Sequence, residues 1–128
     1  MTLEFPQERD ALTERIIGCA IEVHRQLGPG LLESTYESAL CVEAELNGLK
    51  FQRQVVYPIN YKGRIIGEHR VDLIIESAVI LELKSVERHD RIFEAQLLTY
   101  LKITGFRRGL LINFNSRLLK DGIQRFVL

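Results

Sequence analysis

The stretch VDLIIESAVILELK, residues 71–84, decides the fold that we expect for this chain. Two runs of aliphatic and β-branched residues, 71–75 and 79–84, each have the length of a buried strand. The polar step between them, at residues 76–77, is short enough only for a hairpin turn. The stretch therefore predicts two neighbouring antiparallel strands in the interior of a sheet.

Three charged residues interrupt this apolar hairpin. Side chains alternate along a strand, so Glu82 and Lys84 share a face with Ile80, while the intervening leucines point the other way. Asp72, on the neighbouring strand, can reach the same place if the register allows. An unpaired buried charge is costly, so these groups must pair with one another, bind a metal ion or stay near solvent. Spacing alone favours a structural salt bridge of Lys84 with a carboxylate and leaves a metal site open.

Regular patterns on both sides of the hairpin predict the remaining elements. Apolar residues at spacings of three and four indicate two helices before residue 48, separated by the Gly28-Pro29-Gly30 turn, and a third after Asp90, a favourable N-cap. Runs rich in β-branched and aromatic residues indicate strands. The expected elements are helices 8–27 and 32–47, strands 51–61, 64–76 and 78–85, helix 91–104, and strands 109–114 and 122–128.

This order, ααβββαββ, predicts an α/β fold in the sense of an α+β mixed sheet with packed helices. The 128 residues have room for one hydrophobic core, so we expect a single domain over residues 1–128. Cys19 and Cys41 lie within apolar helical patterns and are expected to be small buried hydrophobic residues rather than a disulfide or a metal-binding pair.

The composition is that of an intracellular globular protein. Hydrophobic residues make up 46% and charged residues 27%, and 17 basic residues balance 17 acidic ones. Zero net charge argues against a non-specific nucleic-acid coat protein but leaves room for a local basic patch. No apolar run approaches the ~20 residues of a membrane-spanning helix, and the N-terminal residues lack the apolar region of a signal peptide. We therefore expect a cytoplasmic protein with no membrane partner.

The Glu-x-Lys pattern at residues 82–84, on a central strand of this element order, resembles the PD-(D/E)XK nuclease superfamily. The segment GLLESTY, residues 30–36, is similar to the motif of the GxxExxY protein family, and the resemblance extends through GLLINFN, residues 109–115. Tyr36 is expected to pack, with its hydroxyl at the rim of the site. The proline of the superfamily's "PD" is Val71 here, at a position that supplies no ligand.

The resemblance implies a metal-dependent nuclease that hydrolyses phosphodiester bonds of nucleic acid, with DNA favoured over RNA. Asp72 and Glu82 would hold Mg²⁺ or Mn²⁺, with the Leu83 carbonyl as a third ligand. Lys84 would orient or deprotonate the attacking water and stabilise the developing charge. Glu33 would match the superfamily's helix glutamate, which binds the metal directly or through water. Its alternative role is to complement the dipole at a helix N-terminus.

Five further residues are candidates for substrate contacts. Gln96 and Tyr100 lie four apart on one helix face and resemble the Gln-x-x-x-Tyr element of RecB-like nucleases, although a polar pair at a helix rim would look the same. Arg88 and Arg91 follow the Lys84 strand closely and are the best candidates for phosphate contacts. His24 is either an upstream metal or phosphate ligand or a partner of its helix's C-terminal dipole.

A second hypothesis is a non-catalytic nucleic-acid- or protein-binding module that retains the nuclease fold. Zero net charge favours it, or favours dependence on a homo-oligomer or a partner protein. The three charged residues of the hairpin favour an enzyme, because a scaffold has no reason to keep them. His69 and His89 are expected to be solvated residues of loops or strand ends.

Overall fold

The computed structural model describes residues 10–128, and the first two residues of the expected helix 8–27 lie outside this range. The expected order of helices and strands is confirmed, with one 3-10 helix in addition. The elements are α1 (Ala11–Leu27), α2 (Glu33–Leu46), β1 (Phe51–Tyr61), β2 (Arg64–Ile75), β3 (Val79–Lys84), α3 (Arg91–Thr104), β4 (Arg108–Asn113), η1 (Leu119–Gly122) and β5 (Ile123–Val127).

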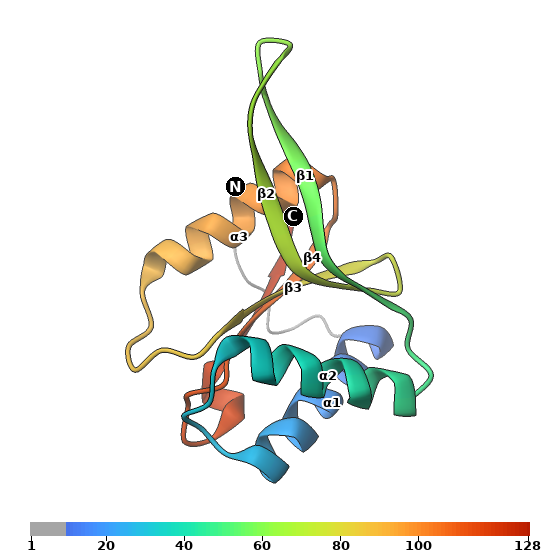
Figure 1. Cartoon of the computed structure of the whole chain (residues 1–128), viewed down its shortest axis with the longest axis vertical. Helices are drawn as coiled ribbons and strands as arrows, with labels where there is room; N and C mark the ends of the chain where they lie inside the picture. The colour runs from blue at the N-terminus through green and yellow to red at the C-terminus, as the bar shows by residue number, and fades with distance from the viewer. Residues whose placement is uncertain (1–9) are drawn as a thin grey trace.

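The strands form one mixed sheet in the order β1-β2-β3-β4-β5. Strands β3 and β4 are parallel and are connected by α3, and the other neighbouring strands are antiparallel. Helices α1 and α2 lie on one side of the sheet and α3 lies on the other (Figure 1). Leu81 and Leu83 pack with α1 and α2, whereas Ile80 packs with α3. The alternation expected for β3 is therefore confirmed, and it directs Glu82 and Lys84 to the α3 side.

Local capping fixes where the helices begin and end. Asp10 accepts a hydrogen bond from the Thr13 N–H at 2.8 Å, and Asp90 accepts one from the Ile92 N–H at 2.9 Å, as N-cap carboxylates do. Gly105 ends α3 in the left-handed conformation, at φ 80°. Within residues 10–128, none of the helices has both the length and the apolar character needed to cross a membrane.

Tyr36 closes the turn between α1 and α2. Its hydroxyl donates to the Gly28 carbonyl at 2.5 Å and accepts from the Leu31 N–H at 3.1 Å. Its ring is fully buried and stacks on Phe114, with 4.5 Å between the ring centroids. The hydroxyl therefore lies inside the turn rather than at the rim of the candidate site, and it fixes the direction in which α2 begins.

We expect Tyr36→Phe to lower the free energy of unfolding by about 1–2 kcal/mol, because two backbone groups of the turn lose their partner while the buried ring remains. Chemical denaturation would measure this loss. Tyr61→Phe is the matched control, because the Tyr61 side chain is 58% exposed. Equal stability of the two variants would contradict the role assigned to the Tyr36 hydroxyl.

Strands β2 and β3 separate early. They pair only from Leu73 opposite Leu81 to Ile75 opposite Val79, whereas β1 and β2 stay paired out to the Tyr61–Arg64 end. The β1–β2 hairpin therefore projects far from the rest of the molecule (Figure 1). The separation leaves the next position of β2, Asp72, beside a stretch of β3 that lacks a ladder partner on that side.

Candidate active site

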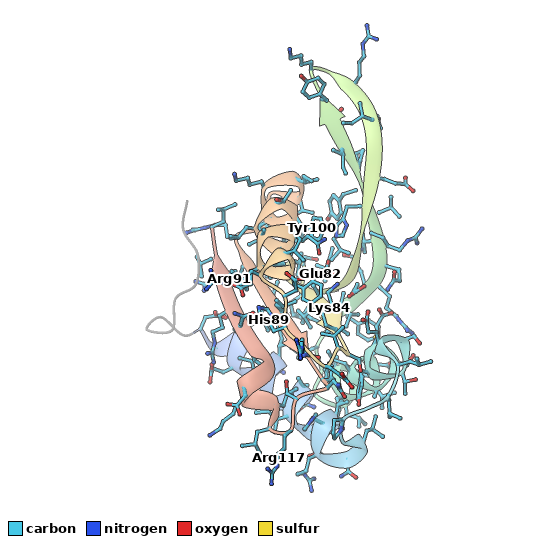
Figure 2. All side chains as sticks on the ribbon, turned by 90° about the vertical axis from the view of Figure 1, so that its left-hand side faces the viewer. Glu82, Lys84, His89, Arg91, Tyr100 and Arg117 are labelled. Carbon is cyan, nitrogen blue, oxygen red and sulfur yellow. The ribbon has the colours of Figure 1, made fainter. Side chains whose placement is uncertain are left out.

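Two carboxyl groups meet where β2 and β3 separate. The Leu83 N–H donates to Asp72 Oδ2 at 2.8 Å, so the Asp72 side chain takes the place of a ladder partner. Glu82 is only 8% exposed, and Asp72 is half-buried. Figure 2 shows Glu82 and Lys84 on β3 in the region where Tyr100 of α3 also lies. The structure thus brings together the three charged residues on which the sequence argument depends.

The electrostatics of this pair oppose full ionisation. The pKa of Glu82 is raised from its usual 4.5 to about 9, chiefly by burial and then by the charge of Asp72, while Lys84 acts in the opposite direction. The pKa of Asp72 is also raised, first by burial, although its hydrogen bond from Leu83 works against the shift. Without a cation, the pair therefore retains a proton at neutral pH.

His69 is part of this site, so the expectation that it is solvated is wrong. Its Nε2 lies 3.2 Å from Glu82 Oε1, and its side chain is 15% exposed. Its ring stacks on Tyr100 with 3.2 Å between centroids. Burial and the charge of Lys84 lower the pKa of His69. A neutral imidazole therefore contacts Glu82 and provides no full countercharge.

A buried polar network supports Asp72 from the α2 side. Glu37 is 6% exposed and accepts from Arg53 Nε at 3.0 Å and from Gln54 Nε2 at 2.6 Å. Gln54 Nε2 also lies 3.5 Å from Asp72 Oδ1. Sequence reasoning missed Glu37. Its position four residues after Glu33, on the same helix face, was the available signal.

Glu33 lies where the beginning of α2 approaches the end of β3. The Ser85 N–H donates to Glu33 Oε2 at 3.4 Å, and Ser85 Oγ donates to the Leu31 carbonyl at 2.6 Å. The charge of Glu33 also contributes to the raised pKa of Asp72. Glu33 therefore acts electrostatically on Asp72, and its role as a metal ligand stays a prediction.

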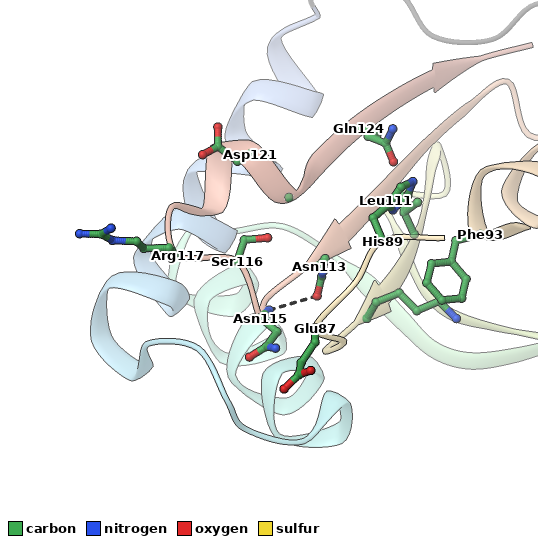
Figure 3. Close-up of a pocket in the computed structure, with 12 residues that line it drawn as sticks. Glu87, His89, Phe93, Leu111, Asn113, Asn115, Ser116, Arg117, Asp121 and Gln124 are labelled. Atoms are coloured by element: carbon green, nitrogen blue, oxygen red, sulfur yellow. Dashed lines mark hydrogen bonds between the residues drawn. The ribbon is translucent and has the colours of Figure 1, made fainter. Parts of the chain in front are cut away.

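Lys84 forms part of the wall of a cavity of about 460 Å³. Its Nζ lies 4.5 Å from the centroid of the Phe93 ring, within the range of a cation–π contact. Figure 3 shows this cavity, with Phe93 on one side and the loop that carries Arg117 on the other. Lys84 thus stands between the carboxyl pair and an open cavity that a substrate could enter.

Asn113 holds the wall of this cavity in place. Its Oδ1 accepts from the N–H groups of Val86 and Asn115, both at 3.1 Å, and its Nδ2 donates to the Val86 carbonyl at 3.0 Å. The side chain therefore connects the segment after β3 to the end of β4, and it is used for structure rather than left free for a ligand.

The other substrate candidates lie around this centre at different places. Tyr100 is adjacent to it through His69, and burial followed by the charges of Glu82 and Asp72 raises the pKa of Tyr100. Gln96 is half-buried on the same helix, and Arg88 and Arg91 are exposed near the beginning of α3.

The two remaining histidines are occupied elsewhere. His24 contacts the Ser116 carbonyl at 2.7 Å and so connects the end of α1 to the loop after β4. Its role as a substrate or metal ligand stays a prediction. His89 is exposed in the segment before α3, as expected, and pairs there with Glu94.

The donor set suits a hard cation with few protein ligands. Within residues 10–128, no group of three or more His, Cys, Asp and Glu side chains is arranged to hold a metal ion. Mg²⁺ keeps several waters and is usually bound by only one or two carboxylates. Two buried carboxyl groups that resist joint ionisation, Asp72 and Glu82, fit such an ion, because its charge would stabilise both in the ionised form.

Comparison with known proteins identifies the superfamily of the chain. The model of the PD-(D/E)XK nuclease superfamily matches residues 10–126. No curated protein matches the chain significantly. The crystal structure of SSO0001 is similar at 17% identity, over 95% of this chain and 78% of that chain, with a TM-score of 0.42. So weak a similarity supports no conclusion about activity. The superfamily match spans most of the sequence, and the chain therefore belongs to the PD-(D/E)XK nuclease superfamily.

Proposed function

We propose that this protein is a metal-dependent nuclease that hydrolyses phosphodiester bonds of nucleic acid, with DNA favoured over RNA. The observation that carries the proposal is the burial of Asp72 beside Glu82, with Lys84 two residues further along β3 on the same face as Glu82. Burying these charged groups destabilises the metal-free protein. The same groups are useful where a cation and a phosphate must be held together. Members of the superfamily typically use divalent metals.

The proposed ligands are Asp72 and Glu82, with the Leu83 carbonyl and, directly or through water, Glu33. A bound Mg²⁺ or Mn²⁺ would lower the pKa of a coordinated water and neutralise charge on the phosphate. Lys84 provides a positive charge beside the carboxyl pair, where it can orient the water and stabilise charge that develops in the transition state. His69 and the network of Glu37 keep the carboxylates in place.

Substrate contacts are proposed for Gln96, Tyr100, Arg88, Arg91 and His24. Tyr100 is best supported, because it stacks on the imidazole that contacts Glu82. The two arginines are exposed and near the cavity beside Lys84, so they are available for phosphate oxygens. The neutral net charge of the chain implies modest affinity, so a homo-oligomer or a partner protein is also proposed to assist binding.

We further propose that the chain belongs to the GxxExxY branch of the superfamily. Three positions of the motif have distinct tasks in the structure. Gly30 adopts φ 100°, which favours glycine. Glu33 approaches the end of β3, and the Tyr36 hydroxyl fastens the turn before α2. The motif thus positions one acidic residue beside the proposed metal site.

Metal binding tests the proposal directly. We expect Mg²⁺ or Mn²⁺ at about 100 times its dissociation constant to stabilise the folded state by about 2.7 kcal/mol, which corresponds to a rise in melting temperature of about 10 °C for a chain of this size. Asp72→Asn should remove most of this rise, because it removes an anionic ligand. Calorimetry with and without EDTA would measure both.

Asp121→Asn is the matched control, because Asp121 is an exposed carboxylate beside the cavity rather than in the carboxyl pair. It should keep the full response to metal. No response in the wild type, or an equal response in Asp72→Asn, would count against the metal site. Cleavage assays on single-stranded, double-stranded and flapped DNA and on RNA then test the activity itself.

A further inference from the structure

The distal part of the β1–β2 hairpin, residues 58–68, forms an arm that touches little of the remaining molecule. Its strands pair with each other from Pro58 opposite Glu68 to Tyr61 opposite Arg64. Just below the arm, the Tyr57 ring meets the ring of Phe106, in the segment between α3 and β4, edge-on. Figures 1 and 2 both show the arm extending beyond the rest of the molecule. The surface of the arm is therefore accessible to another molecule.

The tip of the arm carries uncompensated positive charge. Lys62 and Arg64 flank Gly63 at the turn, and within the described part of the chain neither forms an ion pair. Lys62 Nζ instead lies 5.4 Å from the centroid of the Tyr61 ring. Elsewhere several arginines are paired with carboxylates, as Arg125 is with Glu14. In a chain with zero net charge, the tip of the arm is thus a local basic site, and the single acidic residue of the arm, Glu68, lies at the end away from the tip.

The same tip exposes large apolar side chains. Tyr61 is 58% exposed, Ile65 70% and Ile66 65%. The pairing register shifts between Ile59 and Asn60, which leaves Ile66 as the additional residue of a β-bulge. A bulge re-aims side chains and increases local twist. Apolar side chains next to cations on a narrow projection suit a groove of DNA, where cations contact phosphates and apolar side chains contact base edges.

The candidate active site lies next to the end of the arm that joins the rest of the sheet. His69, the first residue of β2 below the arm, contacts Glu82, and Asp72 follows three residues later. From Asp72 to Arg64 the strand spans eight residues, which corresponds to about 26 Å at about 3.3 Å per residue. Along a duplex this length covers about 8 base pairs at 3.4 Å each. A polymer held at the carboxyl pair can therefore also reach the arm.

We infer that the arm is a duplex-binding element that lies in a groove of double-stranded DNA about 8 base pairs from the bond at the active site. A two-stranded β-ribbon fits the major groove of B-DNA. Lys62 and Arg64 contact phosphates, and Ile65 and Ile66 contact bases. The inference rests on the proposed nuclease function and specifies its substrate as a duplex. Pairing of the arms of two copies is disfavoured, because it would bring together tips of like charge.

Binding of a labelled 20-base-pair DNA duplex to the full chain in EDTA, followed by fluorescence anisotropy at several salt concentrations, tests the arm without cleavage. The double variant Lys62→Ala/Arg64→Ala should bind at least 10-fold more weakly at low salt. The slope of log affinity against log salt should fall in magnitude by about 1.8, which is about 0.9 for each of two lost phosphate contacts. Ile65→Ser/Ile66→Ser should weaken binding without changing the slope.

Lys50→Ala/Lys102→Ala is the matched control, because both lysines are exposed and lie outside the arm. It should leave affinity and slope near wild type. All variants should keep the wild-type melting temperature, since the substituted side chains are exposed. A 6-base-pair duplex is too short to reach the tip, so wild type and the Lys62/Arg64 variant should bind it equally.

Unchanged duplex affinity and slope in the Lys62/Arg64 variant would overturn the inference. Loss of a sedimenting dimer in that variant with duplex affinity unchanged would also overturn it, because the arm would then be an interface between copies. Cleavage of the same duplex with Mn²⁺ separates this inference from the proposed activity. Cleavage at the same rate in the wild type and the Lys62/Arg64 variant would support the proposed nuclease activity and contradict the duplex-binding role of the arm. Duplex binding that depends on Lys62 and Arg64, without any cleavage, would support the role of the arm and contradict the proposed nuclease activity.

Discussion

Replacing Lys84 by alanine should lower the rate of metal-dependent phosphodiester cleavage by about 10²–10³-fold, the typical effect of removing one group that stabilises transition-state charge. Lys84 is positioned for this role beside the carboxyl pair and at the wall of the cavity. The loss should appear in kcat rather than in KM, because the charge acts on the transition state more than on the bound substrate. Its contact with Phe93 is partly exposed, so the fold should be retained.

Lys120→Ala, at an exposed lysine outside the cavity lining, is the control and should cleave like the wild type. Single-turnover cleavage with Mn²⁺, together with melting temperatures, would measure both variants. If Lys84→Ala cleaved normally, the activity would belong to a contaminant or to another site. If metal bound through Asp72 and Glu82 but no substrate were cut, the protein would be the non-catalytic module that was the second hypothesis.

The stability of the metal-free protein should fall as pH rises, and Glu82→Gln should weaken that dependence. The pKa of Glu82 is about 9 in the folded state and near its usual 4.5 when unfolded. Between these values the folded state binds more protons than the unfolded state, so increasing pH favours unfolding. At pH 8.5 we expect the glutamine variant to be more stable by at least ~2 kcal/mol, or about 8 °C in melting temperature.

Near pH 4.5 the two proteins should differ little, because Glu82 then carries its proton in the folded state and glutamine resembles that form. Thermal unfolding in EDTA across this pH range would show the difference. Glu45→Gln is the control, because Glu45 is exposed on α2, and it should follow the wild-type curve. Parallel curves for wild type and Glu82→Gln would contradict the assigned burial and repulsion.

The local patterns predicted α3 and β3 well because both are periodic and bounded by chemical signals. The carboxylate of Asp90 caps α3, and Gly105 ends it in a left-handed conformation. The strand face shared by Glu82 and Lys84 follows from alternation alone. Asp72 was predictable as a neighbour because the hairpin turn at residues 76–77 sets the register.

The partners of the carboxyl pair could not be predicted in the same way. His69 owes its place to Tyr100, which is 31 residues away and reaches it only when α3 packs on the sheet. His69 and Asp72 are three positions apart on β2, and such positions normally face opposite sides of a sheet. Their spacing in the sequence therefore did not indicate that they share a site. Glu37 is buried because Arg53 and Gln54 satisfy it from another element, and such compensation is a tertiary property.

The single parallel pair in the sheet has a consequence for folding order. Asp72 and Glu82 are ten positions apart within one hairpin, so their meeting requires closure of only a short loop. The cavity beside Lys84 also needs β4, which joins β3 only after α3 has crossed the sheet. Low contact order favours early formation of the hairpin. During folding, the carboxyl pair should therefore form while it is still exposed to water. The β4 residues that complete the cavity beside Lys84 should join it later.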